Sequence, residues 1–208
     1  MHGRFLPYDL LDKGTFWLSQ TPDIPSKGWD AAYNRTCTWG LFEHKASGKR
    51  FYHLNTHLDH QGATAREESI KLIASKIKQF NTESYPVFLT ADFNSDTTDN
   101  IFAPLFRTMR DARRTASDTD SEATYNGYKT TSAYKLDHIF HSGCTASLFK
   151  TLTGNYGAPY ISDHYPVYVD IKIPGMSAIQ QTTKNNLEIR LQLSSCELSV
   201  FSAEPINE

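Results

Sequence analysis

Residues 86–94 read PVFLTADFN, a short and mostly apolar run that begins at a proline and turns polar only at its end. Such a run is typical of a strand that is buried on both faces of a sheet. Asp92 and Asn94 follow where the strand gives way to a loop. Because a rigid sheet can position polar groups at its strand ends, this stretch predicts a sheet core and one corner of a functional site.

The segments on either side of this strand predict a chain of mixed strands and helices. The turn HKASGK lies between two β-rich segments, which predicts a hairpin. Residues 64–80 repeat isoleucine at helical spacing, which predicts an amphipathic helix. The hairpin strands are residues 36–42 and 50–56, further strands are expected at 135–141 and 165–173, and irregular or loop structure is expected at 14–34 and 116–134.

The coarse order of these elements is β-β-α-β-α-loop-β-β, which defines a mixed α/β chain. Apolar side chains that repeat on one side of the helix, or lie within the apolar strands, should form its core. We expect burial of Ile70, Ile73, Ile77, Val87, Leu89, Ile139, Val167 and Val169.

The composition fits one globular domain, or one domain followed by a tail. The chain has 208 residues, of which 39% are hydrophobic and 12% aromatic. A formal net charge of -2 argues against a dedicated binder of duplex DNA, which would need clustered Lys and Arg. The three cysteines are widely spaced and include no C-x-x-C pair, so they predict neither a disulfide framework nor a zinc knuckle. No run is apolar for long enough to span a membrane.

A change in composition after Pro174-Gly175 marks a domain boundary. Residues 1–175 are assigned to the domain and residues 176–208 to a tail. The tail begins with a polar, linker-like stretch and then alternates apolar with polar residues, which predicts one further strand with one buried face. This strand is expected either to cover a sheet edge left open by the absent N-terminal strands or to form a dimer contact. The alternating apolar residues are Leu187, Ile189, Leu191 and Leu193.

Four polar clusters each lie at the end of an apolar β-run. Taken singly, most have an ordinary explanation as a turn, a loop or a strand histidine. Asp137 is harder to explain in this way, because a carboxylate in an apolar strand needs a partner and a histidine is the natural one. Asp137 is therefore expected to have a histidine partner, and the four strand-end clusters are candidates for one site. The clusters are Asn55-Thr56-His57, Asp92-Phe93-Asn94, Asp137-His138 and Asp163-His164.

The motifs NTHLDH, TADFNS, LDHIF and SDHYPV resemble, in order and spacing, those of the endonuclease/exonuclease/phosphatase superfamily, which includes deoxyribonuclease I-like proteins. The resemblance covers about residues 4–173. It implies an α/β (α+β) fold that is part of a four-layer α/β/β/α sandwich with mixed, largely antiparallel sheets. The chain resembles the C-terminal portion of the family domain.

The resemblance also implies a divalent-metal-dependent hydrolase of phosphoesters, either a phosphodiesterase or nuclease or a phosphatase. His164 would act as general base on the attacking water, and Asp137 would orient its ring. Asp92 would bind or orient the nucleophile or the metal. The catalytic set is completed by Asn94 and His57, which would donate hydrogen bonds to the phosphate.

The implied ligands are a metal ion and a phosphate ester. Asp92 and Asp163 would hold Mg²⁺ or Mn²⁺, because these ions prefer oxygen ligands. Arg35 would contact the substrate phosphate. The substrate stays open at this stage, with nucleic acid, lipid and sugar phosphate all compatible with the same residues.

The family pattern also has an Asn and a metal-binding Glu upstream of the segment that resembles Arg4–Leu18, and neither has a counterpart here. We therefore expect an N-terminally truncated domain, weak metal binding and reduced activity. One alternative is an inactive fragment or an interaction module of the same fold. Another is a zinc hydrolase of the metallo-β-lactamase type, because residues 57–60 read His-Leu-Asp-His, although Asn55 stands where that motif begins with histidine.

Overall fold

The computed structural model describes residues 7–129, 133–154, 157–158 and 160–174, together with the backbone of two strands at 189–193 and 198–202. Its helices are α1 (Ala63–Phe80), α2 (Ala103–Phe106) and α3 (Ala112–Thr115), and a 3-10 turn, η1 (Asn100–Phe102), precedes α2. Its strands are β1 (Tyr8–Trp17), β2 (Thr36–His44), β3 (Arg50–His57), β4 (Val87–Asp92), β5 (Arg110–Asp111), β6 (Asp137–Ser142), β7 (Thr145–Thr151), β8 (Val167–Lys172), β9 (Ile189–Leu193) and β10 (Leu198–Ser202). Within this described part, no helix has both the length and the hydropathy that crossing a membrane would need.

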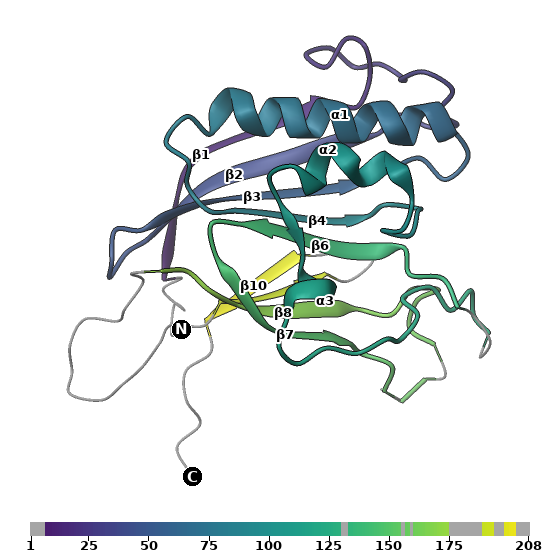
Figure 1. The fold of residues 1–208 in the computed structure, drawn as a ribbon. Helices are drawn as coiled ribbons and strands as arrows, with labels where there is room; N and C mark the ends of the chain where they lie inside the picture. The colour runs from purple at the N-terminus through teal and green to yellow at the C-terminus, as the bar shows by residue number, and fades with distance from the viewer. Residues whose placement is uncertain are drawn as a thin grey trace, which may run out of the picture.

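The described strands form two sheets (Figure 1). The larger sheet has the order β1-β2-β3-β4-β6-β5, with a parallel β3–β4 pair among antiparallel neighbours. The parallel pair needs a crossover connection, which α1 provides. The smaller sheet has the order β10-β9-β8-β7 and is antiparallel throughout. The mixed α/β fold class is thereby confirmed, and the complete four-layer sandwich stays a prediction.

Strand β4 lies at the centre of the packing and is buried on both faces. Leu89 faces the helical layer, where it belongs to the same buried cluster as Ile73 of α1. Phe88 points to the opposite face and packs in a second cluster with Val169 of β8, in the smaller sheet. Figure 1 shows the same layering, with α1 and α2 on one side of the larger sheet and β7 and β8 on the other. The interpretation of residues 86–94 as a doubly buried strand is confirmed.

The expected core is largely confirmed. Seven of the eight residues named from the sequence have exposed fractions of 1% or less. Ile77 differs, because it lies at the margin of the helix-side cluster and is only partly buried. The helix begins at Ala63, where the distant carboxylate of Asp30 accepts hydrogen bonds from the amides of Thr64 and Ala65 at 3.2 and 2.7 Å.

Residues 14–17 were expected to be irregular, but they belong to the edge strand β1, so that expectation was wrong. Among the described strands, β1 pairs only with β2, and a bulge between Leu10 and Asp12 interrupts its register. Most of its side chains are exposed, so the sequence shows no apolar alternation. Gly14 lies against the indole of Trp39, where a Cβ atom would come within 2.8 Å of Nε1.

Strand β7 was not expected from the sequence. A register shift between Ala146 and Leu148 breaks the two-residue repeat by which a strand is recognised. The helix expected after the strand at residues 86–94 is also divided. It forms two short helices, α2 and α3, with β5 between them.

The tail strand expected around residues 187–193 corresponds to β9, which spans Ile189–Leu193; Leu187 lies outside the described residues. β9 pairs with β8 in antiparallel register, with Leu191 opposite Val169. The tail therefore extends the smaller sheet, which is one of the two roles expected for it.

Candidate active site

Three neighbouring strands of the larger sheet meet at one position. In the register, Asp92 of β4 lies opposite His57 of β3 on one side and opposite Asp137 of β6 on the other. Neighbouring strands are about 4.8 Å apart, so these side chains can reach one another across the sheet edge. His164 comes from the loop before β8, and a bridge between His164 and Tyr125 ties that loop to a second one. Strand pairing therefore places three of the expected site residues together, and the side chain of His164 joins them through Asp137.

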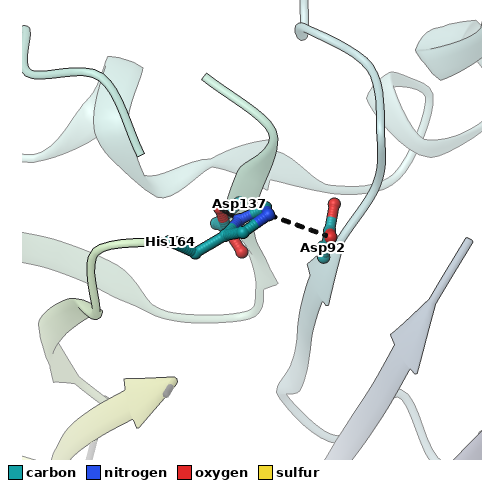
Figure 2. Close-up of side chains that lie close together, drawn as sticks. All are labelled: Asp92, Asp137 and His164. Atoms are coloured by element: carbon teal, nitrogen blue, oxygen red, sulfur yellow. Dashed lines mark hydrogen bonds and ion pairs between the residues drawn. The ribbon is translucent and has the colours of Figure 1, made fainter. Parts of the chain in front are cut away.

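Asp92, Asp137 and His164 form the strand-end cluster, in which candidate metal-ligand atoms lie within 4.8 Å of one another. His164 Nδ1 donates to Asp137 Oδ2 over 2.7 Å. The opposite ring nitrogen, Nε2, lies 3.7 Å from Asp92 Oδ2. Figure 2 shows the ring between the two carboxylates. The contact expected between Asp137 and His164 is confirmed.

The electrostatics of the cluster follow from its partial burial. Burial and the nearby charge of Asp137 raise the pKa of Asp92 to about 6, although the Asn94 backbone amide, which donates to Asp92 over 2.8 Å, acts in the opposite direction. Burial alone would lower the pKa of His164, but the hydrogen bond to Asp137 and the surrounding carboxylates outweigh it, and the pKa is raised. The site thus contains carboxylates that a positive charge would stabilise.

His57 and Asn94 lie on the β3 side of the cluster. His57 Nε2 is 3.2 Å from Asp92 Oδ2 and 3.1 Å from Asn94 Nδ2. The Asn94 amide also donates to the carbonyl of Leu58 over 3.0 Å, and its backbone has a positive φ of 49°. Burial and the charge of Arg35 lower the pKa of His57. One amide hydrogen of Asn94 therefore faces His57 and the open side of the site, where a ligand oxygen can replace that contact.

Arg35 is held beside this group by Asp59, which the sequence did not single out as a functional residue. Arg35 Nε lies 3.5 Å from Asp59 Oδ2, and Nη2 lies 3.4 Å from His60 Nδ1. Asp59 is buried, but its carboxylate accepts backbone hydrogen bonds from residues that include Tyr33 and Gly62. Burial would raise the pKa of Asp59, and these amides outweigh burial and lower it. The signal was present in NTHLDH, whose Asp59 was considered only as a zinc ligand.

Asp163, an expected metal ligand, lies next to the cluster without joining it. Its carboxylate accepts a hydrogen bond from Ser162 Oγ over 3.3 Å, and its backbone carbonyl accepts from the amides of Asn126 and Gly127. The carboxylate does not belong to the metal-ligating group found among the described residues. The same holds for the His-Leu-Asp-His segment expected of a zinc hydrolase, since His57, Asp59 and His60 form no second group in that part of the chain.

The donor set fits a hard divalent cation only in part. Mg²⁺ and Mn²⁺ take carboxylate oxygens and waters, and Asp92 has a raised pKa that a nearby cation would relieve. Asp137 Oδ2, however, is engaged by His164. Asp92 is thus the principal protein ligand that the cluster offers, and water would complete the coordination of an ion.

Comparison with solved structures shows the family to which this fold belongs. Among solved structures, the chain is similar to the mannosyl-6-phosphatase Bt3783 of Bacteroides thetaiotaomicron VPI-5482, with a TM-score of 0.74 and 35% identity over 79% of this chain and 67% of that one. An endonuclease/exonuclease/phosphatase from Bacteroides vulgatus has a TM-score of 0.74 and 34% identity, over 80% and 67% of the two chains. The chain belongs to the endonuclease/exonuclease/phosphatase family.

More distant comparisons agree on the fold. The catalytic domain of human Nocturnin has a TM-score of 0.61 and 17% identity, over 79% of this chain and 60% of that one. Among curated proteins, the uncharacterized protein L388 of Acanthamoeba polyphaga mimivirus is 35% identical over 83 residues, which are 38% of this chain and 31% of that protein. The chain thus spans about a third of that relative's length. No family model matches the sequence.

Proposed function

We propose that the chain hydrolyses phosphoesters by attack of a water molecule that His164 activates. The observation that supports this most strongly is the 2.7 Å hydrogen bond from His164 Nδ1 to Asp137 Oδ2. A proton held on Nδ1 leaves Nε2 as the acceptor nitrogen of the neutral ring, on the side that faces Asp92. A water there can give its proton to Nε2 as it attacks phosphorus.

Two carboxylates stabilise the imidazolium that this step creates. Asp137 remains hydrogen-bonded to the ring, and Asp92 lies on its other side. Because Asp137 already holds the ring through Nδ1, little reorganisation accompanies the proton transfer to Nε2. The proton later leaves to the alcohol or to solvent, which returns His164 to its neutral state.

The phosphate is proposed to lie between this cluster and the β3 side of the site. Asn94 Nδ2 can donate to an oxygen that gains negative charge during attack. His57 and Arg35 contribute further donors, and Arg35 adds a permanent positive charge. Each is already positioned by a contact within the site: Asn94 to the Leu58 carbonyl, His57 to Asp92 and Arg35 to Asp59.

A divalent cation, Mg²⁺ or Mn²⁺, is proposed as the cofactor. Asp92 would be its main protein ligand and Asp163 a second one, reached directly or through water. When bound, the ion would neutralise charge on the phosphate oxygens. Few protein ligands imply weak affinity, so millimolar metal is expected to be needed.

The substrate class is proposed from the relatives and the charge of the chain. The name of one relative, mannosyl-6-phosphatase, describes a sugar phosphate monoesterase. The net charge of -2 lacks the basic surplus that long nucleic acids require. A small phosphate monoester is therefore the first substrate to test, with an oligonucleotide as the comparison.

The test is a hydrolysis screen of the purified chain with millimolar Mg²⁺ or Mn²⁺. His164→Ala should reduce the rate about 10²–10⁴-fold, the range for loss of a general base. Ile24→Ala, an exposed substitution outside the cluster, should have no effect. If the folded wild-type chain released phosphate from none of these esters, the alternative of an inactive fragment or interaction module would replace this proposal.

A further inference from the structure

Tyr33 is an exposed aromatic residue that is nevertheless held in place. Its side chain is 63% exposed, so it adds little to the core. Its ring stacks on His60, with centroids 5.7 Å apart and planes inclined by 18°. The guanidinium of Arg35 lies 5.9 Å from the Tyr33 ring centroid. An exposed ring that is stacked from beneath presents a defined surface to ligands.

Two carboxylates tie the backbone around Tyr33 to other segments of the chain. The Tyr33 amide donates to Asp59 Oδ2 over 3.1 Å, which ties it to the loop after β3. Three residues earlier, Asp30 caps α1 through the amides of Thr64 and Ala65. Gly62 permits this approach, because a Cβ there would come within 2.7 Å of Asp30 Oδ1. The ring thus has a fixed position at little further cost in conformational entropy.

The stacked pair borders the proposed phosphate site. Asp59 connects the two, since it holds the Tyr33 amide and also pairs with Arg35. The charge of Arg35 is felt by both His57 and Asp92. A phosphate bound by Arg35 would therefore place its esterified group next to Tyr33.

We propose that Tyr33, supported by His60, is a stacking platform for a ring in the group esterified to the phosphate. This inference rests on the proposed function and deepens it, because it assigns the substrate to ring-bearing esters. A hexose and a nucleobase share the required chemistry, a flat apolar face beside polar edges. A phosphate of an acyclic alcohol offers no such face and would gain nothing from the platform.

The test measures binding by calorimetry in a His164→Ala background, so that it does not depend on turnover. The probes are a hexose phosphate, a nucleoside monophosphate and glycerol phosphate, each in millimolar Mg²⁺. Tyr33→Ala should weaken binding of at least one ring-bearing probe about 10-fold, in line with the loss of one stacked ring. Tyr33→Phe keeps the ring and should bind like the parent. Ile24→Ala changes a similarly exposed apolar side chain, 58% exposed, in the same loop and should also bind like the parent.

The two ring-bearing probes separate the sources of the ring. A loss for the nucleoside monophosphate alone identifies a nucleobase, and a loss for the hexose phosphate identifies a sugar ring. Equal weakening of glycerol phosphate, or no weakening of either ring-bearing probe, would overturn the platform. An inactive wild-type chain that still showed the Tyr33-dependent difference would contradict the proposed hydrolysis and leave the platform standing.

Discussion

The strand-end cluster and the loop that carries Tyr33 and Arg35 lie side by side but are held in place by different means. The cluster is placed by backbone register, because Asp92 lies opposite a site residue on each neighbouring strand. The loop lies between β1 and β2 and is placed by two carboxylates, Asp30 and Asp59, that accept hydrogen bonds from backbone amides. The sheet fixes the groups that are proposed to act on phosphorus, and side-chain hydrogen bonds fix those proposed to recognise the substrate.

This difference predicts two kinds of defect. Changes in the cluster should reduce kcat, because they alter groups that act during the reaction. Changes in the carboxylates that hold the loop, Asp30 and Asp59, should mainly raise KM. They displace groups that bind the substrate both in the ground state and during the reaction.

Removal of metal should have the largest effect. A chelator should reduce hydrolysis to the background rate, because the charge on the attacked phosphate would no longer be neutralised. Millimolar Mg²⁺ or Mn²⁺ should restore the rate, as measured by released phosphate. Activity that persists after exhaustive chelation would show that the cluster works without an ion.

Asp137→Asn should come next, with kcat reduced about 10²-fold or more and KM little changed. The amide cannot hold the His164 ring as the carboxylate does, nor stabilise its charged form. Asp118→Asn is the matched control, since Asp118 is an exposed partner of Lys150 outside the site. Equal losses in the two variants would indicate a structural defect.

The sheet beneath the cluster should make stability depend on pH. His53 of β3 is buried and bonded to Thr90, and burial lowers its pKa to about 4. In the unfolded chain His53 is protonated below about pH 6.5, whereas in the folded chain it is protonated only below about pH 4. Stability is therefore fully present above pH 6.5 and is lost as pH falls toward 4, by about 3 kcal/mol from this group.

Denaturant titrations at about pH 7 and about pH 4.5 test this contribution. His53→Asn retains a polar partner for Thr90 but cannot take up a proton, so its stability should fall less between the two values. Identical losses in the variant and the wild type would assign the acid sensitivity to other groups.

Asp59→Asn should have the smallest of these effects, a rise in KM of about 10-fold with kcat largely retained, because Arg35 and Tyr33 lose a shared anchor. Asp30→Asn changes the other anchor of the loop without touching Arg35, and should affect KM less. Steady-state kinetics on one ester compare the pair. A larger rise in KM for Asp30→Asn than for Asp59→Asn would contradict this prediction. It would show that substrate binding depends more on the contact between the loop and α1 than on Asp59.

The sequence predicted the features that depend on local pattern. The doubly buried strand at 87–92 and the helix at 63–80 follow from apolar periodicity. The cost of burying an unpartnered carboxylate predicted a histidine partner for Asp137, and the family resemblance identified that partner as His164. The family motifs supplied the remaining members of the site.

The missed features depend on contacts between segments far apart in the chain. β1 is an exposed edge strand, and its pattern cannot be read without its partner β2. The link from Asp59 to Tyr33 and Arg35 spans more than twenty residues and involves backbone amides, which leave no mark in the sequence. The position of the Asp163 carboxylate relative to the strand-end cluster also depends on contacts with a distant loop, at Asn126 and Gly127, so the sequence alone could not predict it.

His164 is proposed to activate a water molecule that attacks phosphorus. The most direct measurement is hydrolysis of a phosphate monoester in water labelled with heavy oxygen, followed by mass analysis of both products for the wild type and His164→Ala. The label should enter the released phosphate, and its rate of entry should fall about 10²–10⁴-fold in the variant. Label in the alcohol, or equal rates of entry for the two proteins, would contradict it.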